Sequence, residues 1–139
     1  MDCIFCRIVA GSVPAFKVYE DTATLAFMDI NPLSEGHVLV IPKQHAANLW
    51  EIGEESLRDT IAAARIVAGG LRASLGLDSM NLVQSNGPWA LQSVDHFHLH
   101  LVPRRKDDGV PLDWELTAGN RDKIKRCAEK IAAALAAKS

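Results

Sequence analysis

The residues with the most chemical potential in this chain are three alternating histidines, His96, His98 and His100. In a β-strand alternate side chains share a face, so the three imidazoles point one way. The residues between and after them, Phe97, Leu99 and Leu101, then face the core. Neighbouring histidine Cα atoms lie roughly 6.6 Å apart on a strand, which lets two adjacent imidazoles act on one ligand.

Three interpretations of this cluster compete. The first is a polar strand face exposed to water. The second is a catalytic metal held by two of the histidines, as in zinc sites with three histidine ligands. The third is covalent catalysis, with His98 as the nucleophile and its neighbours handling phosphate charge and proton transfer. The spacing does not separate the second interpretation from the third.

The cysteines form a second group. Cys3 and Cys6 make a C-x2-C pair, which fits a redox pair, half of a zinc site, or two unligated thiols. A redox pair normally opens a helix after a strand, and no strand pattern precedes Cys3. A zinc site needs two further ligands. Cys127 falls on the apolar stripe of a predicted helix and is expected to be a small buried side chain.

Composition narrows the class of protein. The chain has 139 residues, 48% hydrophobic and 23% charged, with a formal net charge of −2. These values predict one globular domain and exclude intrinsic disorder. The near-neutral balance gives no reason to expect a nucleic-acid or membrane partner. No apolar run approaches the roughly 18 residues of a membrane span, and there is no signal-peptide pattern, so we expect a cytoplasmic protein.

The elements that must position the histidines follow from hydrophobic periodicity. A long helix is predicted over 54–75, where Leu57, Ile61, Ala64, Ala68, Leu71 and Leu75 form one stripe. Gly69 and Gly70 inside it indicate either close backbone packing or a break. Shorter helices are predicted over 3–10 and from an Asn120 cap to about 137, the latter with Ile124, Cys127, Ile131 and Leu135 inward.

Strand patterns occupy 17–20, 24–28, 37–41, 80–83 and 96–102, and Pro42 closes the third. Several strands joined by short turns, with one long helix crossing over, describe an α+β domain. The sheet is expected to be five-stranded and mainly antiparallel, with an added C-terminal helix. The strand order does not follow from the pattern.

The H-φ-H-φ-H-φ-φ motif resembles the signature of the histidine triad (HIT) family of nucleotide hydrolases and transferases. Further matching segments, in order, are Phe5…Ile8, Tyr19–Asp21, Ala26–Ile30, Gly36–His45 and Gln92–Val94. The resemblance covers about 3–105. It implies a HIT domain over 1–105, followed by an extension over 106–139 that includes the last helix and packs on the same domain. By the same resemblance we expect a homodimer with a sheet continued across the interface.

The resemblance also implies roles for individual residues. His98 matches the nucleophile that forms a nucleotidyl-histidine, with its tautomer fixed by a backbone carbonyl near His96. His100 matches the position that contacts the α-phosphate and assists the leaving group. Asp29 matches the ribose-binding acid. The base pocket would comprise Phe5, Ile8, Phe27 and Ile30, for which an ordinary core role is equally expected; the phosphate loop would comprise Leu91, Gln92 and Ser93, with Asn86 nearby.

The cysteine pair acquires two partners in this resemblance. Several family members combine such a pair with the histidine of the I-P-K-x-H segment and the first histidine of the triad. Here those residues are His45 and His96, which with Cys3 and Cys6 would hold a structural Zn²⁺. Such a closed site leaves His98 free for covalent work.

Three positions depart from the commonest family pattern. Ser85 stands where Asn is frequent, although Asn86 is adjacent, Leu91 replaces a usual Gly, and Asp95 occupies an often aromatic position. The expected function is hydrolysis at the α-phosphorus of a nucleoside phosphoramidate or dinucleoside polyphosphate, with a purine (AMP- or GMP-like) nucleotide. The alternative is a nucleotide- or zinc-binding interaction module with vestigial catalysis.

Overall fold

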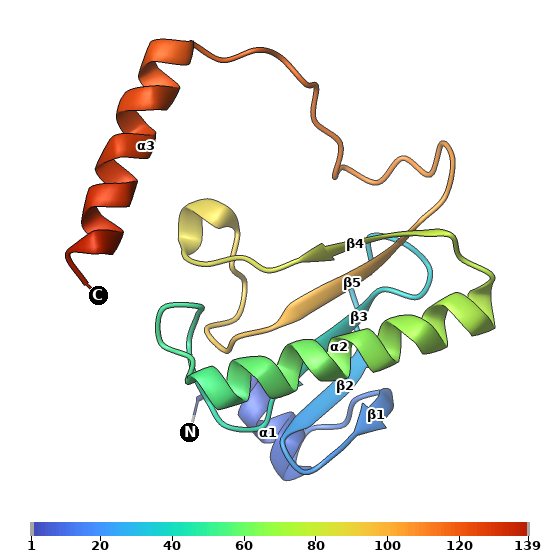
Figure 1. The fold of residues 1–139 in the computed structure, drawn as a ribbon. Coiled ribbons are helices and arrows are strands. Elements are labelled where there is room, and N and C mark those ends of the chain that lie inside the picture. The colour runs from blue at the N-terminus through green and yellow to red at the C-terminus, as the bar shows by residue number, and fades with distance from the viewer. Residues whose placement is uncertain (1, 139) are drawn as a thin grey trace.

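A computed structural model of the chain describes residues 2–138 as an α+β fold. The five strands form one antiparallel sheet in the order β1-β2-β3-β5-β4 (Figure 1). In chain order the elements are α1 (Ile4–Ala10), β1 (Lys17–Glu20), β2 (Thr24–Met28), β3 (Val38–Pro42), α2 (Glu54–Leu75), β4 (Ser79–Val83), a 3-10 turn (Pro88–Ala90), β5 (Leu99–Arg104) and α3 (Arg121–Ala136). The predicted α+β class, the five strands and the crossover helix are confirmed.

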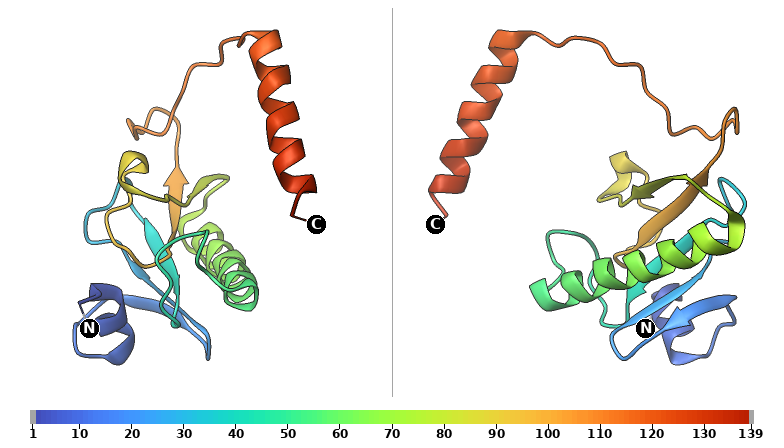
Figure 2. Two further views of the ribbon diagram at one scale, coloured as in Figure 1. Left: turned by 90° about the vertical axis from the view of Figure 1, so that its left-hand side faces the viewer. Right: turned by 45° about the vertical axis from the view of Figure 1, so that its right-hand side comes forward.

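The sheet carries α1 on one face and α2 on the other (Figure 2). Strand alternation divides the buried side chains between the two. Leu25 and Phe27 of β2 face α1, where they join Phe5, Ile8, Leu39 and Ile41 in one core cluster. Ala26, Val38, Val40, Leu99 and Leu101 join α2 in the other cluster. The strands therefore form two apolar layers, one on each face of the sheet, and α1 packs on the layer with fewer buried residues.

Helix α2 has the predicted bounds and ends at Gly76 in the left-handed conformation. Five of the six predicted stripe residues pack in the core cluster under this helix: Leu57, Ala64, Ala68, Leu71 and Leu75. The sixth, Ile61, is 44% exposed, and the buried residues also include Thr60, Ala63 and Val67. A Cβ at Gly69 or Gly70 would meet nothing within 4 Å, so the close packing inferred there is wrong and the helix runs through without a break.

Strand β5 begins three residues later than predicted, at Leu99. The β3–β5 register pairs Val40 with Leu99, so continuing it would set Ile41 against His98 and then Pro42 against Phe97. Pro42 has no N–H to donate, and the Phe97 N–H donates instead to the Ala46 carbonyl at 2.7 Å. The predicted alternation nevertheless persists, because Phe97 packs in the α2 layer while His96 and His98 lie on the opposite side, near Phe5.

Helix α3 stands apart from the sheet at the end of an extended segment (Figure 1). Asn120 caps it as predicted, its side chain accepting from the Lys123 N–H. All described α3 residues are exposed, so within this chain the helix does not pack on the domain as we expected, and the prediction of a buried Cys127 is wrong. An apolar stripe shows that a helix is amphipathic but does not specify the surface that covers it. Across residues 2–138, no helix combines the length and apolarity that a membrane crossing requires.

Gly36 and Gly69 make a contrasting pair of positions for substitution. Gly36 has a φ of +90°, and a Cβ there would lie 2.5 Å from Leu75 Cδ1. We expect Gly36→Ala to lower the free energy of unfolding by about 2 kcal/mol, through backbone strain and crowding. Gly69→Ala fills open space in a helix and should raise it by about 1 kcal/mol. Urea unfolding measures both, and equal effects of the two substitutions would contradict this packing.

Candidate active site and metal site

A cross-strand row forms the floor of a cavity on the α1 face. Phe27 of β2 pairs with Leu39 of β3, and Leu39 pairs with His100 of β5. All three side chains line a cavity of about 300 Å³, a size that suits a small-molecule ligand. His98 and His100 thereby lie at a cavity whose wall includes Ile4, Phe5 and Ile8 of α1.

Most of the predicted binding residues line this cavity together. They are Phe5, Ile8, Phe27, Asp29, Ile30 and Ser93, with His98 and His100. Ile30 lies at the rim, 79% exposed, whereas Phe5 and Ile8 are buried. The sequence interpretation missed further lining residues: Ile4, Val13, Pro14, Ala15, Met28, Asn31, Leu39 and Val94. Val13 to Ala15 follow α1 as a loop, and their apolar, Pro-containing composition carried no signal specific to a ligand.

His98 is held in one tautomer by its backbone surroundings. Its Nδ1 donates to the carbonyl oxygen of His96 at 2.7 Å, which places the ring proton on Nδ1. Nε2 therefore carries a free lone pair. Because His98 also lines the cavity, this arrangement presents an unprotonated imidazole nitrogen for nucleophilic attack.

His37 is a site residue that the sequence interpretation missed. The Leu33 N–H donates to its Nδ1 at 3.0 Å, so the proton of neutral His37 is on Nε2. Nε2 lies 2.9 Å from His100 Nδ1, to which it donates. His100 then bears its own proton on Nε2. The place of His37 in the matching segment Gly36–His45 was the available signal, but its pairing with His100 is a tertiary contact that the motif does not specify.

Asp29 lies beside this pair. Its Oδ1 accepts from the Asn31 N–H at 2.8 Å, and its Oδ2 lies 3.4 Å from His37 Nε2. Burial lowers the pKa of His37, although the Asp29 charge opposes the change. The contact is therefore between a carboxylate and a neutral imidazole at pH 7, with Asp29 lining the cavity as an acceptor.

Burial keeps the triad neutral. It lowers the pKa of His98 and of His96, each against an opposing hydrogen bond to a backbone carbonyl. Burial, followed by repulsion from His98 and His37, lowers the pKa of His100 to about 4. At neutral pH His98 is thus available as a nucleophile, and His100 offers a neutral N–H donor.

The expected phosphate loop is only partly free to bind an anion. The N–H groups of Leu91 and Gln92 already donate to the carbonyls of Pro88 and Gly87. Ser93 is the residue of this loop that lines the cavity. Leu91 has a φ of 63°, so the residue that replaces a usual Gly adopts the left-handed conformation that Gly favours.

The side chains of Gln92 and Asn86 are not in the cavity lining. Gln92 Nε2 donates to the Ala47 and Val94 carbonyls, and its Oε1 accepts from the Gly87 N–H. Asn86 Oδ1 accepts from the Leu49 N–H, and its amide pairs with Gln84. Both residues therefore tie the loop to the segment after β3. Asp95 is exposed and lines an adjoining hollow with Cys3 and His45.

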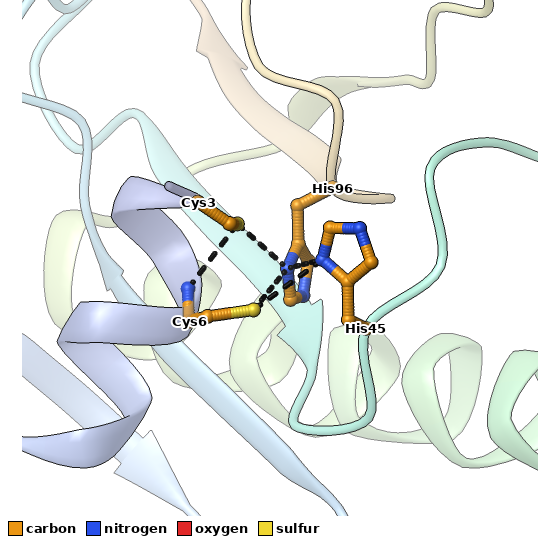
Figure 3. A group of neighbouring side chains, drawn as sticks. All are labelled: Cys3, Cys6, His45 and His96. Carbon is orange, nitrogen blue, oxygen red and sulfur yellow. Dashed lines mark hydrogen bonds between the residues drawn. The ribbon is translucent and has the colours of Figure 1, made fainter. Parts of the chain in front are cut away.

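Cys3, Cys6, His45 and His96 converge on one point (Figure 3). The two cysteines come from the start of α1, His45 from the loop after β3, and His96 from the segment before β5. His96 Nε2 donates to the Pro42 carbonyl at 2.8 Å, which leaves Nδ1 as the free ligand atom. Such a second hydrogen bond orients a metal-binding imidazole.

The spacing of these atoms fits a tetrahedral ion. His96 Nδ1 lies 3.3 Å from Cys3 Sγ, 3.6 Å from Cys6 Sγ and 3.2 Å from His45 Nδ1, and the Cys6 Sγ to His45 Nδ1 distance is 3.3 Å. Tetrahedral Zn²⁺, with bonds of about 2.3 Å to sulfur and 2.0 Å to nitrogen, separates its ligands by about 3.3 to 3.7 Å. Burial, with the neighbouring Cys3, raises the pKa of the Cys6 thiol to about 11, so a metal ion must displace its proton.

The fold and the histidine site described above are those of a known protein family. The HIT domain family model matches residues 10–107, and the chain belongs to that family. It is 39% identical over 132 residues to the adenosine 5'-monophosphoramidase hnt1 of Schizosaccharomyces pombe, covering 94% of this chain and 96% of that protein. A HIT family crystal structure from Bacillus subtilis is 37% identical with a TM-score of 0.87, covering 95% of this chain and 96% of the other.

A third comparison bears on the metal site. A Zn-bound histidine triad family protein from Mycobacterium smegmatis is 35% identical, with a TM-score of 0.76, covering 100% of this chain and 99% of that chain. The same comparison shows how far the similarity extends along the chain. It continues beyond residue 105, where we expected it to end, and includes the C-terminal extension. The fold agreement also confirms the family resemblance read from the histidine motif.

The depressed histidine pKa values predict acid sensitivity of the fold. A histidine whose folded pKa lies below its unfolded value of about 6.5 contributes stability above that pH and loses it as the pH falls toward the folded pKa. For His100 this window runs from about 6.5 down to about 4. Urea unfolding from pH 7 to 4.5 should show decreasing stability, and His100→Gln should reduce the slope by up to about 1.4 kcal/mol per pH unit. An unchanged slope would contradict a buried neutral His100.

Two substitutions of His37 separate its two contacts. The amide of Gln reaches the place of Nε2 and keeps a donor to His100, whereas Asn keeps an acceptor for the Leu33 N–H. If His37 fixes the His100 tautomer, His37→Asn should lower kcat by about 10²-fold and His37→Gln by much less. Steady-state kinetics on a nucleoside phosphoramidate measures this. Equal losses of kcat, tracking equal losses of thermal stability, would mean that His37 acts only in packing.

Proposed function

We propose that this protein hydrolyses a nucleoside phosphoramidate or a dinucleoside polyphosphate at the α-phosphorus through a nucleotidyl-His98 intermediate. The observation that carries the proposal is a neutral His98 whose Nε2 lone pair is free at a cavity of nucleotide-subsite size. The phosphoramidase name of the fission yeast relative supports the reaction class. Family membership alone supports nucleotide hydrolysis more broadly.

In the proposed first step, His98 Nε2 attacks the α-phosphorus and forms a P–N bond as the bond to the leaving group breaks. The leaving group carries away the electron pair of that bond: a phosphoramidate nitrogen, protonated from solvent, departs as the neutral amine, a polyphosphate departs as its anion, and His98 becomes a cationic nucleotidyl-imidazolium until water hydrolyses it and releases a proton. His100, with its proton on Nε2, donates a hydrogen bond to the leaving group or to a phosphate oxygen, and Ser93 donates to the phosphate. Water then hydrolyses the P–N bond, which releases the nucleoside monophosphate and returns neutral His98.

The rest of the cavity supports nucleotide binding. Asp29 has an acceptor oxygen beside the floor, which suits a ribose hydroxyl. Phe5, Ile8, Phe27 and Ile30 provide apolar walls for the base, so recognition of a purine by contact follows, with loose discrimination between AMP- and GMP-like ligands. Asn86 and Gln92 contribute to binding only through the loop that they hold.

Zn²⁺ is proposed at Cys3, Cys6, His45 and His96, as a structural ion. The support is the ligand spacing, the Pro42 hydrogen bond that orients His96, and the Zn-bound relative. Four protein ligands leave no position open for water, so the ion would supply stability and take no part in the reaction. Metal analysis of the purified protein should find about one zinc per chain.

A homodimer is proposed through β4. This strand ends the sheet, and Leu82 on it is half exposed. Ile61, Met80 and Leu82 line an apolar groove between α2 and β4, which a second copy would cover if the two sheets joined at this edge. Covering the groove would also remove an exposed edge strand that favours aggregation.

Replacing His98 by Asn tests the reaction. The substitution removes the nucleophile and keeps a similar polar volume, so turnover of adenosine phosphoramidate should fall by about 10³-fold or more while AMP affinity stays within about threefold. Mass spectrometry after a basic quench should detect the nucleotidyl adduct in the unmodified protein and none in His98→Asn. If the unmodified protein binds AMP but hydrolyses neither adenosine phosphoramidate nor a diadenosine polyphosphate, the protein is a binding module.

A further inference from the structure

The side chains of Cys3 and helix α1 face two different sites, the proposed metal site and the cavity. Cys3 and Cys6 point to His45 and His96, as Figure 3 shows. Phe5 and Ile8, interleaved with them, line the cavity that holds His98. Helix α1 has seven residues, about two turns, and moves as one rigid element. A displacement of Cys3 and Cys6 therefore also displaces Phe5 and Ile8.

Phe5 contacts the proposed nucleophile, the base wall and a proposed metal ligand. Its ring centroid is 5.3 Å from that of Phe27 and 5.3 Å from that of His98, both in edge contacts. It is also 5.9 Å from the ring of His96, a proposed metal ligand. The wall that would hold a base therefore touches the nucleophile on one side and the metal site on the other.

The two sides of the metal site are held differently. His96 is fixed by the Pro42 carbonyl, and its neighbour Phe97 by the Ala46 carbonyl, so this segment keeps its place through hydrogen bonds of its own. Helix α1 rests on the sheet through the apolar packing of Phe5 and Ile8. A metal ion bound by Cys3 and Cys6 would add a rigid link from α1 to that hydrogen-bonded segment.

We propose that Cys3 and Cys6 are positioning residues for the nucleotide: a Zn²⁺ bound to them fixes α1, and α1 fixes the base wall of Phe5 and Ile8. Zinc and nucleotide then bind with positive coupling, each raising the affinity for the other by the same factor. The proposal rests on the proposed function for both its ligands. It adds that the metal acts on nucleotide affinity and leaves the chemical step at His98 largely alone.

Calorimetry on the full chain measures the coupling in both directions. AMP is titrated into zinc-loaded and chelator-stripped protein, and zinc is titrated with and without saturating AMP. We expect zinc to tighten AMP binding by about tenfold, and AMP to tighten zinc binding by the same factor. Hydrogen exchange of residues 4–10 should slow when zinc is added, and slow further with AMP.

Variants separate positioning from general destabilisation. Cys6→Ser should raise KM for adenosine phosphoramidate by about tenfold with kcat within about twofold, because His98 keeps its bond to the His96 carbonyl. Cys127→Ser is the matched control, since this thiol is exposed on α3 and should change neither constant. In Phe5→Ala, zinc should still bind, but its effect on AMP affinity should disappear.

The outcomes are distinct. If AMP and zinc both bind but neither changes the affinity for the other, the inference is wrong and the proposed function stands. If AMP does not bind the zinc-loaded protein, the proposed function and the inference both fail. If zinc does not bind at all, the proposed zinc site and the inference fail, and the proposed hydrolysis at His98 stands. A fall of kcat in Cys6→Ser with KM unchanged would also overturn the inference. Should Cys6→Ser not fold, the zinc titrations of the unmodified chain, with and without AMP, decide the question.

Discussion

The hydrogen bond from His98 Nδ1 to the His96 carbonyl is the interaction on which the site depends. It places the ring proton away from the cavity and leaves Nε2 free, which no burial or charge effect could do alone. The 96–97 segment that supplies this carbonyl lies outside the sheet ladder, before β5 begins. Pro42 makes this possible, since it lacks the N–H that would continue the ladder and its carbonyl accepts from His96. One proline thus ends a strand and indirectly sets the tautomer of the proposed nucleophile.

Around this bond the protein keeps several imidazoles neutral. Buried histidines favour the uncharged form, and each ring nitrogen that is not needed for chemistry is given a partner. In residues 2–138 every buried side-chain nitrogen or oxygen has a hydrogen-bond partner. The pair His37 and His100 extends the same logic, because a backbone N–H at Leu33 determines the proton positions on both rings. The tautomers of His37 and His98 are thus fixed by backbone groups, the Leu33 N–H and the His96 carbonyl, and not by a charged side chain.

Local patterns predicted much of this fold, and tertiary contacts account for what they missed. The bounds of α2 and of β1 and β2 follow from periodicity and turn residues, because each pattern is satisfied within a few residues. His98, Asp29 and the Cys2His2 group followed from motif resemblance, and the geometry brings them together. His37 was missed because its partner lies 63 residues away. Gln92 and Asn86 bond to the protein and do not line the cavity, which the sequence did not show because a polar loop side chain has the same signature whether it binds a ligand or the loop itself.

The exposed α3 has a consequence for the helix signal of the protein. Because none of its 16 residues is buried within the described part of the chain, 2–138, the helix depends largely on intrinsic propensity, and isolated helices of about that length are marginal in water. Helices α1 and α2 melt with the sheet that they cover. Circular dichroism of a dilute monomer would therefore record two events, a gradual fraying of α3 and a cooperative transition of the body. Where another surface covers α3, the fraying disappears into the main transition, so the shape of a melting curve reports whether this helix is covered.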